Sequence, residues 1–255
     1  MNIDLSGKTA LVLGASGGLG GAIARGLIGA GAKVAVAGRS ADKLKAAVPQ
    51  AAHVLVADLT TAEIGPNLAR DATAALGQVD ILINNSGGPP PTTALATTTD
   101  IWHQQFGAMV LSLITLTGGL VPGMRERGWG RVITVASSGI VAPIPNLAVS
   151  NSLRSALLGW SKTLASEVAA DGVTVNLVLP GRIATSRVEA LDKAAAERTG
   201  KSIKEVEAAA LASIPAARYG SPDEFAAAAV FLASPQASYI TGTTIRVDGG
   251  ALRNV

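Results

Sequence analysis

Residues 8–30 read KTALVLGASGGLGGAIARGLIGA, and the spacing of apolar residues changes within this stretch. Residues 9–13 are a continuous apolar run, which is typical of a strand buried on both faces. From residue 22 onward, apolar residues recur every three or four positions, which predicts a helix. The stretch therefore predicts a buried strand that turns directly into a helix at residues 14–20.

Glycine occupies four positions of this turn, Gly14, Gly17, Gly18 and Gly20. Backbone without Cβ atoms lets another group approach closely, and the free amides at a helix N-terminus favour an anion such as pyrophosphate. The spacing is G-x-x-x-G-x-G rather than the commoner G-x-G-x-x-G, so two interpretations remain open. The turn either binds a dinucleotide or uses its glycines only for tight packing.

The bulk properties exclude several classes of protein. A chain of 255 residues without a polar linker predicts one domain, residues 1–255. Its 21 basic and 18 acidic residues are spread evenly, which indicates neither a nucleic-acid nor an anionic-membrane partner. The chain has no cysteine, so it has no disulfide and no thiolate metal site, and we expect no metal. We find no signal peptide and no run long and apolar enough to span a bilayer, which predicts a cytoplasmic protein.

Strands and helices are predicted to alternate along the chain, which indicates an α/β protein. After the strand at 80–84 come the residues NSGG and three prolines, at the edge where open α/β sheets bind ligands. The prolines either wall a substrate pocket or hold a surface turn. Residues 182–215, polar and weakly helical, follow another strand end and form either a mobile lid over a substrate or a plain surface excursion.

The residues after the strand predicted at 33–37 bear on the choice of nucleotide. An acidic residue there would bind a ribose and repel a 2′-phosphate, but the sequence has Gly38. Arg39 offers a bidentate partner for that phosphate, which favours NADP over NAD. The alternative is that Arg39 is an ordinary exposed loop arginine.

Five segments in order carry a family resemblance: GASGGLG from Gly14, NNSG from Asn84, the strand ending at Ser137, PGRIAT from Pro180 and YITGTTIRVDGG from Tyr239. Together they resemble the short-chain dehydrogenase/reductase family, and most closely its 3-oxoacyl-acyl-carrier-protein reductase branch. The resemblance implies a Rossmann-type, doubly wound, seven-stranded parallel sheet with helices on both faces. It also implies NADP as cofactor, with NAD as an alternative, a small-molecule substrate and a homo-oligomer, either tetramer or dimer.

By position, the resemblance assigns fifteen residues to the cofactor, in four groups along the sheet edge. They are Gly14, Ser16, Gly18, Leu19 and Gly20 at the pyrophosphate and ribose, Arg39, Asp58 and Leu59 at the adenosine, Asn85, Ser86 and Gly87 at the adenine and nicotinamide ribose, and Pro180, Gly181, Ile183 and Thr185 at the nicotinamide.

The catalytic positions depart from the family pattern of a serine, a tyrosine thirteen residues later, a lysine four beyond that, and an asparagine. Ser137 matches the serine, but Ser150, Arg154 and Met109 stand at the other three positions. A serine hydroxyl is far less acidic than a tyrosine, and arginine gives up no proton near neutrality, so the usual proton relay cannot operate unchanged. We hypothesise that Ser150 and Asn151, opposite Ser137, orient a water that carries the proton.

Two functions follow from this combination. The first is an oxidoreductase that transfers a hydride between NADP(H) and a carbonyl or alcohol, with Ser137, Ser150, Asn151 and Arg154 as candidate catalytic residues. The alternative is a dinucleotide-binding protein without redox turnover, in a regulatory or sensing role, because fold alone does not establish chemistry.

Overall fold

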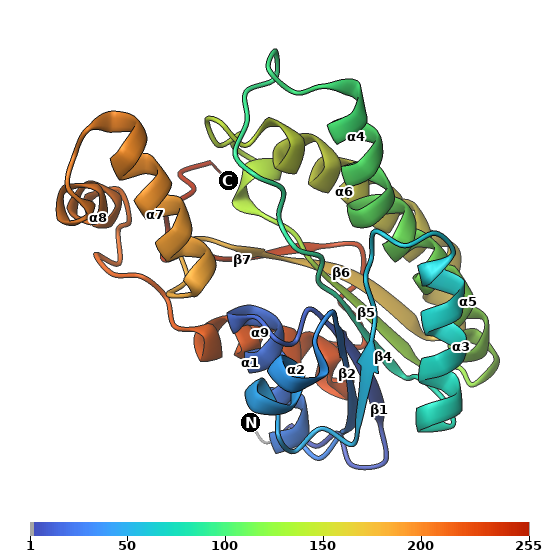
Figure 1. Cartoon of the computed structure of the whole chain (residues 1–255). Helices are drawn as coiled ribbons and strands as arrows, with labels where there is room; N and C mark the ends of the chain where they lie inside the picture. Colours follow the sequence, from blue (N-terminus) through green and yellow to red (C-terminus); the bar gives the residue numbers. More distant parts are fainter. Residues whose placement is uncertain (1–2, 255) are drawn as a thin grey trace.

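Seven parallel strands form a single sheet with the order β3-β2-β1-β4-β5-β6-β7, and helices cover both of its faces (Figure 1). The computed structural model describes residues 3–254. The strands are β1 (Thr9–Leu13), β2 (Lys33–Gly38), β3 (His53–Val56), β4 (Ile81–Asn84), β5 (Gly130–Val135), β6 (Val173–Pro180) and β7 (Thr244–Val247). The expected doubly wound sheet is confirmed, and its order reverses between β3 and β4, which places a ligand crevice beside the carboxyl end of β1.

Most of the helices lie in two layers over the sheet. The helices are α1 (Gly18–Gly29), α2 (Ala41–Ala47), α3 (Ile64–Leu76), α4 (Thr99–Phe106), α5 (Ser112–Glu126), α6 (Ala148–Val168), α7 (Ser186–Thr199), α8 (Ile203–Ala212) and α9 (Pro222–Ala233). The exceptions to the two layers are α7 and α8, which pack chiefly on each other. Successive side chains of β1 point to opposite faces of the sheet. Ala10 and Val12 belong to the core under α1 and α9. Leu11 and Leu13 belong to the core under α3 and α5. Burial on both faces explains why the strands are continuous apolar runs.

Glycine stands at the contact between helices α3 and α5 and lets them pack closely. A Cβ on Gly65 would lie 2.7 Å from the backbone nitrogen of Leu116 and 2.8 Å from the carbonyl oxygen of Ser112. A Cβ on Gly119 would lie 2.7 Å from the Ala69 side chain. The spacing between the two helices therefore depends on these small residues.

We expect Gly65→Ala to lower the free energy of unfolding by about 1–3 kcal/mol, because the added methyl group meets rigid helix backbone. Thermal or urea unfolding measures the change. Gly118→Ala in α5 is the control, since nothing lies within 4 Å of a Cβ there. The control should be neutral or stabilising, by up to about 1 kcal/mol, because alanine favours a helix. Equal melting temperatures for Gly65→Ala and the wild type would contradict this account of the packing.

Helices α4 and α5 form one continuous helix, Thr99–Glu126, interrupted by a π-helical turn at Gly107–Leu111. An 18-residue window of this helix has a mean hydropathy of 1.6, so by length and composition it is apolar enough to cross a membrane. The expectation that no run meets these criteria was wrong. Half of that window is buried inside the fold, which is the pattern of a core helix.

A buried arginine ties several elements together at the amino edge of the sheet. Arg131 in β5 is 1% exposed, and its guanidinium donates to the carbonyls of Gly130 and Gly172 and to the hydroxyl of Ser238. It also lies 4.4 Å from the centroid of the Trp129 ring. Burial lowers the pKa of Arg131 to about 10, so it remains a cation at neutral pH.

Candidate active and cofactor site

The turn after β1 and the loop after β4 touch each other at the ligand edge. Gly14 has a φ of 61°, and a Cβ there would lie 2.7 Å from the carbonyl oxygen of Asn85. The side-chain amide of Asn85 donates to the Leu13 carbonyl at 3.2 Å. A Cβ on Gly20 would lie 2.5 Å from the carbonyl oxygen of Gly14. Glycine is therefore required here both by the backbone angle and by the close approach.

The first turn of α1 faces this crevice as an open anion site. Its N-cap is Gly17, and the described helix has neither a side-chain cap nor an acidic residue in its first turn. The backbone amides and the positive end of the helix dipole are thus available to a pyrophosphate. Ser16 and Gly18 are exposed beside them, and Leu19 is half-buried. The glycine cradle and the uncapped helix fit a dinucleotide.

Charged side chains at the ends of β2 and β3 fit the adenosine end of NADP. Arg39 is exposed and forms no ion pair among residues 3–254. The Asp58 carboxylate accepts hydrogen bonds from the Thr60 amide and hydroxyl, which together with the Arg39 charge keep the pKa of Asp58 low. Leu59, half-buried, follows Asp58. Arg39 is therefore free to meet a 2′-phosphate.

The segment after β6 runs back across the glycine turn. Gly181 packs on the end of β7, where a Cβ would lie 2.6 Å from the Cα of Asp248. Ile183 is buried, and Thr185 caps α7 by accepting from the Val188 amide. A Cβ on Gly18 would lie 2.6 Å from the Thr185 methyl group. Residues 180–185 therefore close the crevice on the side opposite the loop after β4.

Ser137 lies at the carboxyl end of β5. Its hydroxyl oxygen accepts a hydrogen bond from the Gly139 amide at 3.1 Å and thereby caps the short 3₁₀ helix Ser138–Ile140. The side chain is only half-buried, and its hydroxyl hydrogen is left to donate to a ligand oxygen.

Arg154 is a buried cation directly beside this edge. It is 7% exposed, and its guanidinium donates to the carbonyls of Val135 at 2.8 Å, Ser86 at 3.4 Å and Gly87 at 3.5 Å. Burial and, to a smaller extent, the charge of Arg187 together lower the pKa of Arg154 to about 10. Arg154 is therefore charged at neutral pH and joins the end of β5 to the loop after β4.

The other catalytic candidates have different surroundings. Ser150 is 7% exposed and lies one turn before Arg154 on α6. Asn151 holds the loop that precedes α6, because its side-chain amide donates to the Ile144 carbonyl and its oxygen accepts from the Ile144 amide. These two bonds leave one N–H of the Asn151 amide and one lone pair of its oxygen unused, so its part in orienting a water stays a prediction.

Met109, at the position of the family's asparagine, lies in the π-helical turn and is 2% exposed. It belongs to the core between the sheet and helices α5 and α6. A thioether in this position fills apolar space and cannot hold a water by strong hydrogen bonds.

The side chains of this site predict an unusual pH profile. The two serines do not titrate, and Arg154 stays protonated until the pH approaches its pKa of about 10. We expect kcat/KM for carbonyl reduction to stay nearly constant from about pH 6 to about pH 9 and to fall above that as Arg154 loses its charge. Initial rates in buffers of constant ionic strength measure this. A change in kcat/KM with a midpoint near pH 7 would show that another titrating group takes part in the reaction.

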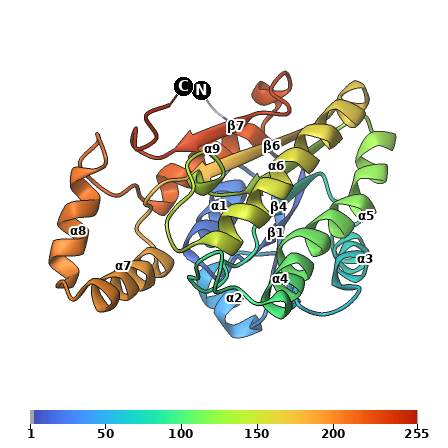
Figure 2. The ribbon, with the colours of Figure 1, turned by 90° about the horizontal axis from the view of Figure 1, so that it is seen from above.

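Residues 182–215 form two helices, α7 and α8, and not the weakly helical stretch that the sequence predicted. They pack chiefly on each other and project from one side of the molecule (Figures 1 and 2). One of their attachments to the body is a cluster in which the buried Asp192, 2% exposed, pairs with Arg182 and accepts from the Tyr219 hydroxyl at 2.9 Å. Sequence reasoning missed Asp192, because nothing in the sequence indicates its partners.

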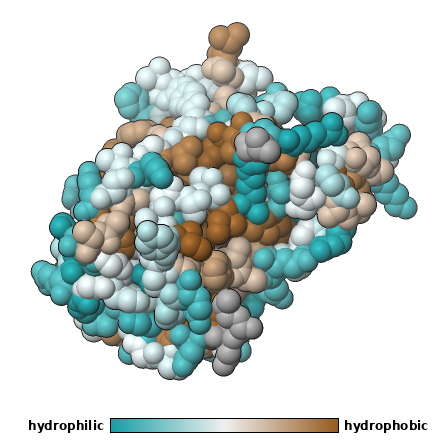
Figure 3. Space-filling model, turned by 180° about the vertical axis from the view of Figure 1, so that it is seen from behind, coloured by the Kyte–Doolittle hydropathy of each residue, from teal (hydrophilic) through white to brown (hydrophobic). Residues whose placement is uncertain are grey.

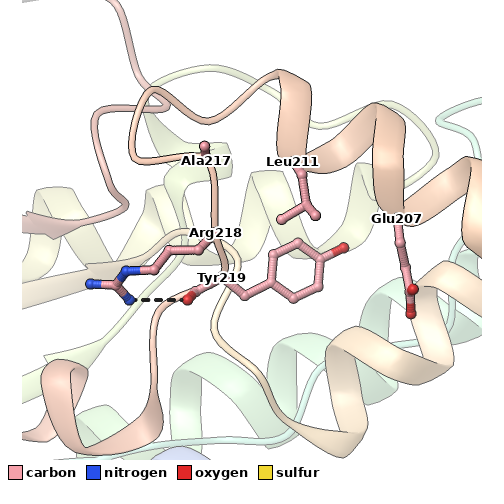
Figure 4. A pocket seen from close by; sticks show the side chains of 5 residues that line it. All are labelled: Glu207, Leu211, Ala217, Arg218 and Tyr219. Carbon is pink, nitrogen blue, oxygen red and sulfur yellow. Dashed lines mark hydrogen bonds between the residues drawn. The ribbon is translucent and has the colours of Figure 1, made fainter.

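A hollow of about 380 Å³ opens beside this cluster, lined by Glu207, Leu211, Ala217, Arg218 and Tyr219. Figure 4 shows the Tyr219 ring turned toward Leu211 of α8, while Arg218 points the other way. This hollow lies outside the crevice formed by the glycine turn and Ser137. We therefore place the site by side-chain chemistry rather than by the size of the cavity.

Comparison with known proteins agrees with this geometry. The sequence model of a family described as Enoyl-(Acyl carrier protein) reductase matches residues 14–251. The chain belongs to the short-chain dehydrogenase/reductase family. Within this family it is 35% identical to the 3-oxoacyl-[acyl-carrier-protein] reductase FabG of Salmonella typhimurium over 253 residues, covering 97% of this chain and 98% of that one. It is 36% identical to FabG of Rickettsia bellii over 253 residues, covering 98% and 99%.

Among solved structures of the short-chain dehydrogenase/reductase type, L-sorbose reductase from Gluconobacter frateurii superimposes with a TM-score of 0.92 at 33% identity, and the match covers all of both chains. That structure holds NADPH and L-sorbose.

Proposed function

We propose that this protein is an NADP(H)-dependent oxidoreductase that interconverts a carbonyl and an alcohol, in the manner of a 3-oxoacyl reductase. The observation that carries the proposal is the glycine cradle beside Asn85, which continues along the same sheet edge to Ser137 and Arg154. The similar proteins are named as reductases, and this favours turnover over a binding-only role. The fifteen cofactor residues predicted from the sequence all lie at or beside this edge, and we propose that they hold NADP.

Bound NADPH would supply the hydride that adds to the carbonyl carbon. The chain's own groups act on the carbonyl oxygen. The Ser137 hydroxyl donates a hydrogen bond to it, and the Arg154 charge stabilises the negative charge that develops there. A water between Ser137 and Ser150 then delivers the proton that completes the alcohol, because no side chain of this set is an acid near neutrality.

We propose that residues 182–215 act as a lid within a single domain, residues 1–255. Helices α7 and α8 bury few of their residues, and the N-cap of α7, Thr185, lies beside the glycine turn. The cluster around Asp192 provides one fixed point about which the rest of the segment can move.

We also propose a homo-oligomer that works in the cytoplasm. Figure 3 shows a band of apolar side chains across the back of the molecule, bordered by polar ones. Two further apolar side chains, Phe106 and Leu111 of the helix Thr99–Glu126, are 39% and 47% exposed elsewhere on the surface. A second copy of the chain would cover such surface.

One experiment tests the function. NADPH and NADH are titrated by fluorescence, and nicotinamide absorbance is then followed with ketones, 3-oxoacyl thioesters and quinones. We expect NADPH to bind more tightly than NADH and to be oxidised, and we expect Ser137→Ala to lower kcat without changing NADPH affinity. Binding without oxidation by any substrate would support the binding-only alternative. Failure of both dinucleotides to bind would overturn the assignment.

A further inference from the structure

Arg187, in the first turn of α7, reaches across the crevice to the loop after β4. One terminal nitrogen, Nη2, donates to the Pro89 carbonyl at 2.9 Å. The guanidinium also lies against Gly88, where a Cβ would be 3.0 Å from Nη2 and 3.4 Å from Nε. The side chain is exposed, so its remaining donors are accessible to a ligand.

Arg154 approaches the same loop from the protein interior. Its bonds to the carbonyls of Ser86 and Gly87 and the bond of Arg187 to Pro89 place two guanidinium groups on residues 86–89. Burial, and after it the charge of Arg187, lowers the pKa of Arg154, so the two charges are close enough to affect each other. Two positive charges therefore meet at the loop after β4.

Neither of these arginines forms an ion pair with any residue in the range 3–254. Other arginines of the chain do have carboxylate partners: Arg125 pairs with Asp171, Arg182 with Asp192 and Arg218 with Glu224. Backbone carbonyls orient the two guanidinium groups at the crevice but neutralise neither charge. A ligand with a negative charge would therefore be stabilised here, and the repulsion between the two arginines would be relieved.

We infer that Arg187 binds a carboxylate on the substrate, so that the protein reduces oxo acids in preference to neutral ketones. A carboxylate has two coplanar oxygens, which suit the donors that Arg187 has left after its bond to Pro89. Arg154, behind the loop, adds to the positive potential but stays bound to its carbonyls. This inference rests on the proposed function, and it also gives the lid a role, since Arg187 lies in the first turn of the first lid helix.

The test compares matched pairs that differ only in charge. The probes are 2-oxobutanoate, 3-oxobutanoate, 4-oxopentanoate and 5-oxohexanoate, each beside its methyl ester, with NADPH and the full-length protein. We expect the acid of at least one pair to be preferred in kcat/KM by about tenfold or more, the size expected for a hydrogen-bonded charge. In Arg187→Met the preference should disappear through a higher KM for the acid, with the ester unchanged. Arg198→Met, an exposed arginine on the same helix, is the matched control and should behave as wild type.

Calorimetry on the NADPH-bound protein compares the binding of acid and ester without turnover. A protein that binds the acid but does not reduce it would contradict the proposed reductase function and leave the inference about Arg187 intact. We expect heat of binding from an acid but not from its ester, and loss of that heat in Arg187→Met. Equal use or equal binding of acid and ester in every pair would overturn the inference. It would also be overturned if Arg187→Met weakened NADPH rather than the acid, because Arg187 would then serve the cofactor's phosphates.

Discussion

Replacing Ser150 with tyrosine and Arg154 with lysine together is expected to raise kcat for carbonyl reduction at least about hundredfold, the usual contribution of a positioned acid. Ser150 lies in the first turn of α6 and Arg154 one turn later, so both side chains share one face of the helix beside Ser137. A phenol at position 150 would donate the proton that water delivers in the wild type. An ammonium at position 154 would lower the pKa of that phenol.

The control for this double variant is Ser150→Phe with Arg154→Lys, which adds the same ring without the hydroxyl. It should show no gain, and steady-state kinetics at saturating NADPH compare the two. Arg154→Lys alone should lower the melting temperature, because one ammonium cannot reach all three carbonyls that the guanidinium contacts. A folded tyrosine–lysine variant with normal NADPH affinity and wild-type kcat would show that something other than the proton donor limits the rate.

Gly20→Ala is expected to weaken NADPH binding at least about hundredfold, equivalent to a loss of about 2.7 kcal/mol. A Cβ at this position would lie 2.5 Å from the Gly14 carbonyl oxygen and 2.8 Å from the side-chain nitrogen of Asn85. The backbone oxygen cannot move without disturbing the end of β1, so the start of α1 must shift instead. The amides that would face the pyrophosphate then lose their positions.

Gly29→Ala at the last residue of α1 is the matched control, because nothing lies within 4 Å of a Cβ there. It should keep wild-type affinity and melting temperature. Fluorescence titration with NADPH separates the two variants, and circular dichroism confirms that both fold. Unchanged NADPH affinity in Gly20→Ala would mean that the glycine turn serves packing alone.

Much of the fold could be predicted because strands buried on both faces of a parallel sheet consist of continuous apolar residues. The strand expected at 9–13 is observed as Thr9–Leu13. Helix α3 begins only at Ile64, because Glu63 has a φ of 55° and ends the preceding turn, which no local sequence pattern indicates. The cofactor edge could be located from glycines and strand ends, since both are local features of the sequence.

The remainder of the site depends on contacts between residues far apart in the chain. Arg187 and Pro89 are 98 positions apart, and no local pattern links them. The role of Asn151 in holding the Ile144 loop was also invisible, because a polar residue beside Ser150 suits either task. Helix α8 does carry a local signal, because Ser202 and Glu205 form a capping box at its start.

Arg131 and its partners lie at the opposite end of the sheet from every group proposed to touch cofactor or substrate. Substitutions that alter the reaction can therefore accumulate at the carboxyl end of the strands, while the contacts of Arg131 at the amino end maintain the fold. A molecule divided in this way is well suited to laboratory evolution, in which loops and the α7–α8 segment are randomised and the strands that Arg131 connects are left alone. The same division explains how a chain can exchange its proton-transfer residues and keep its shape.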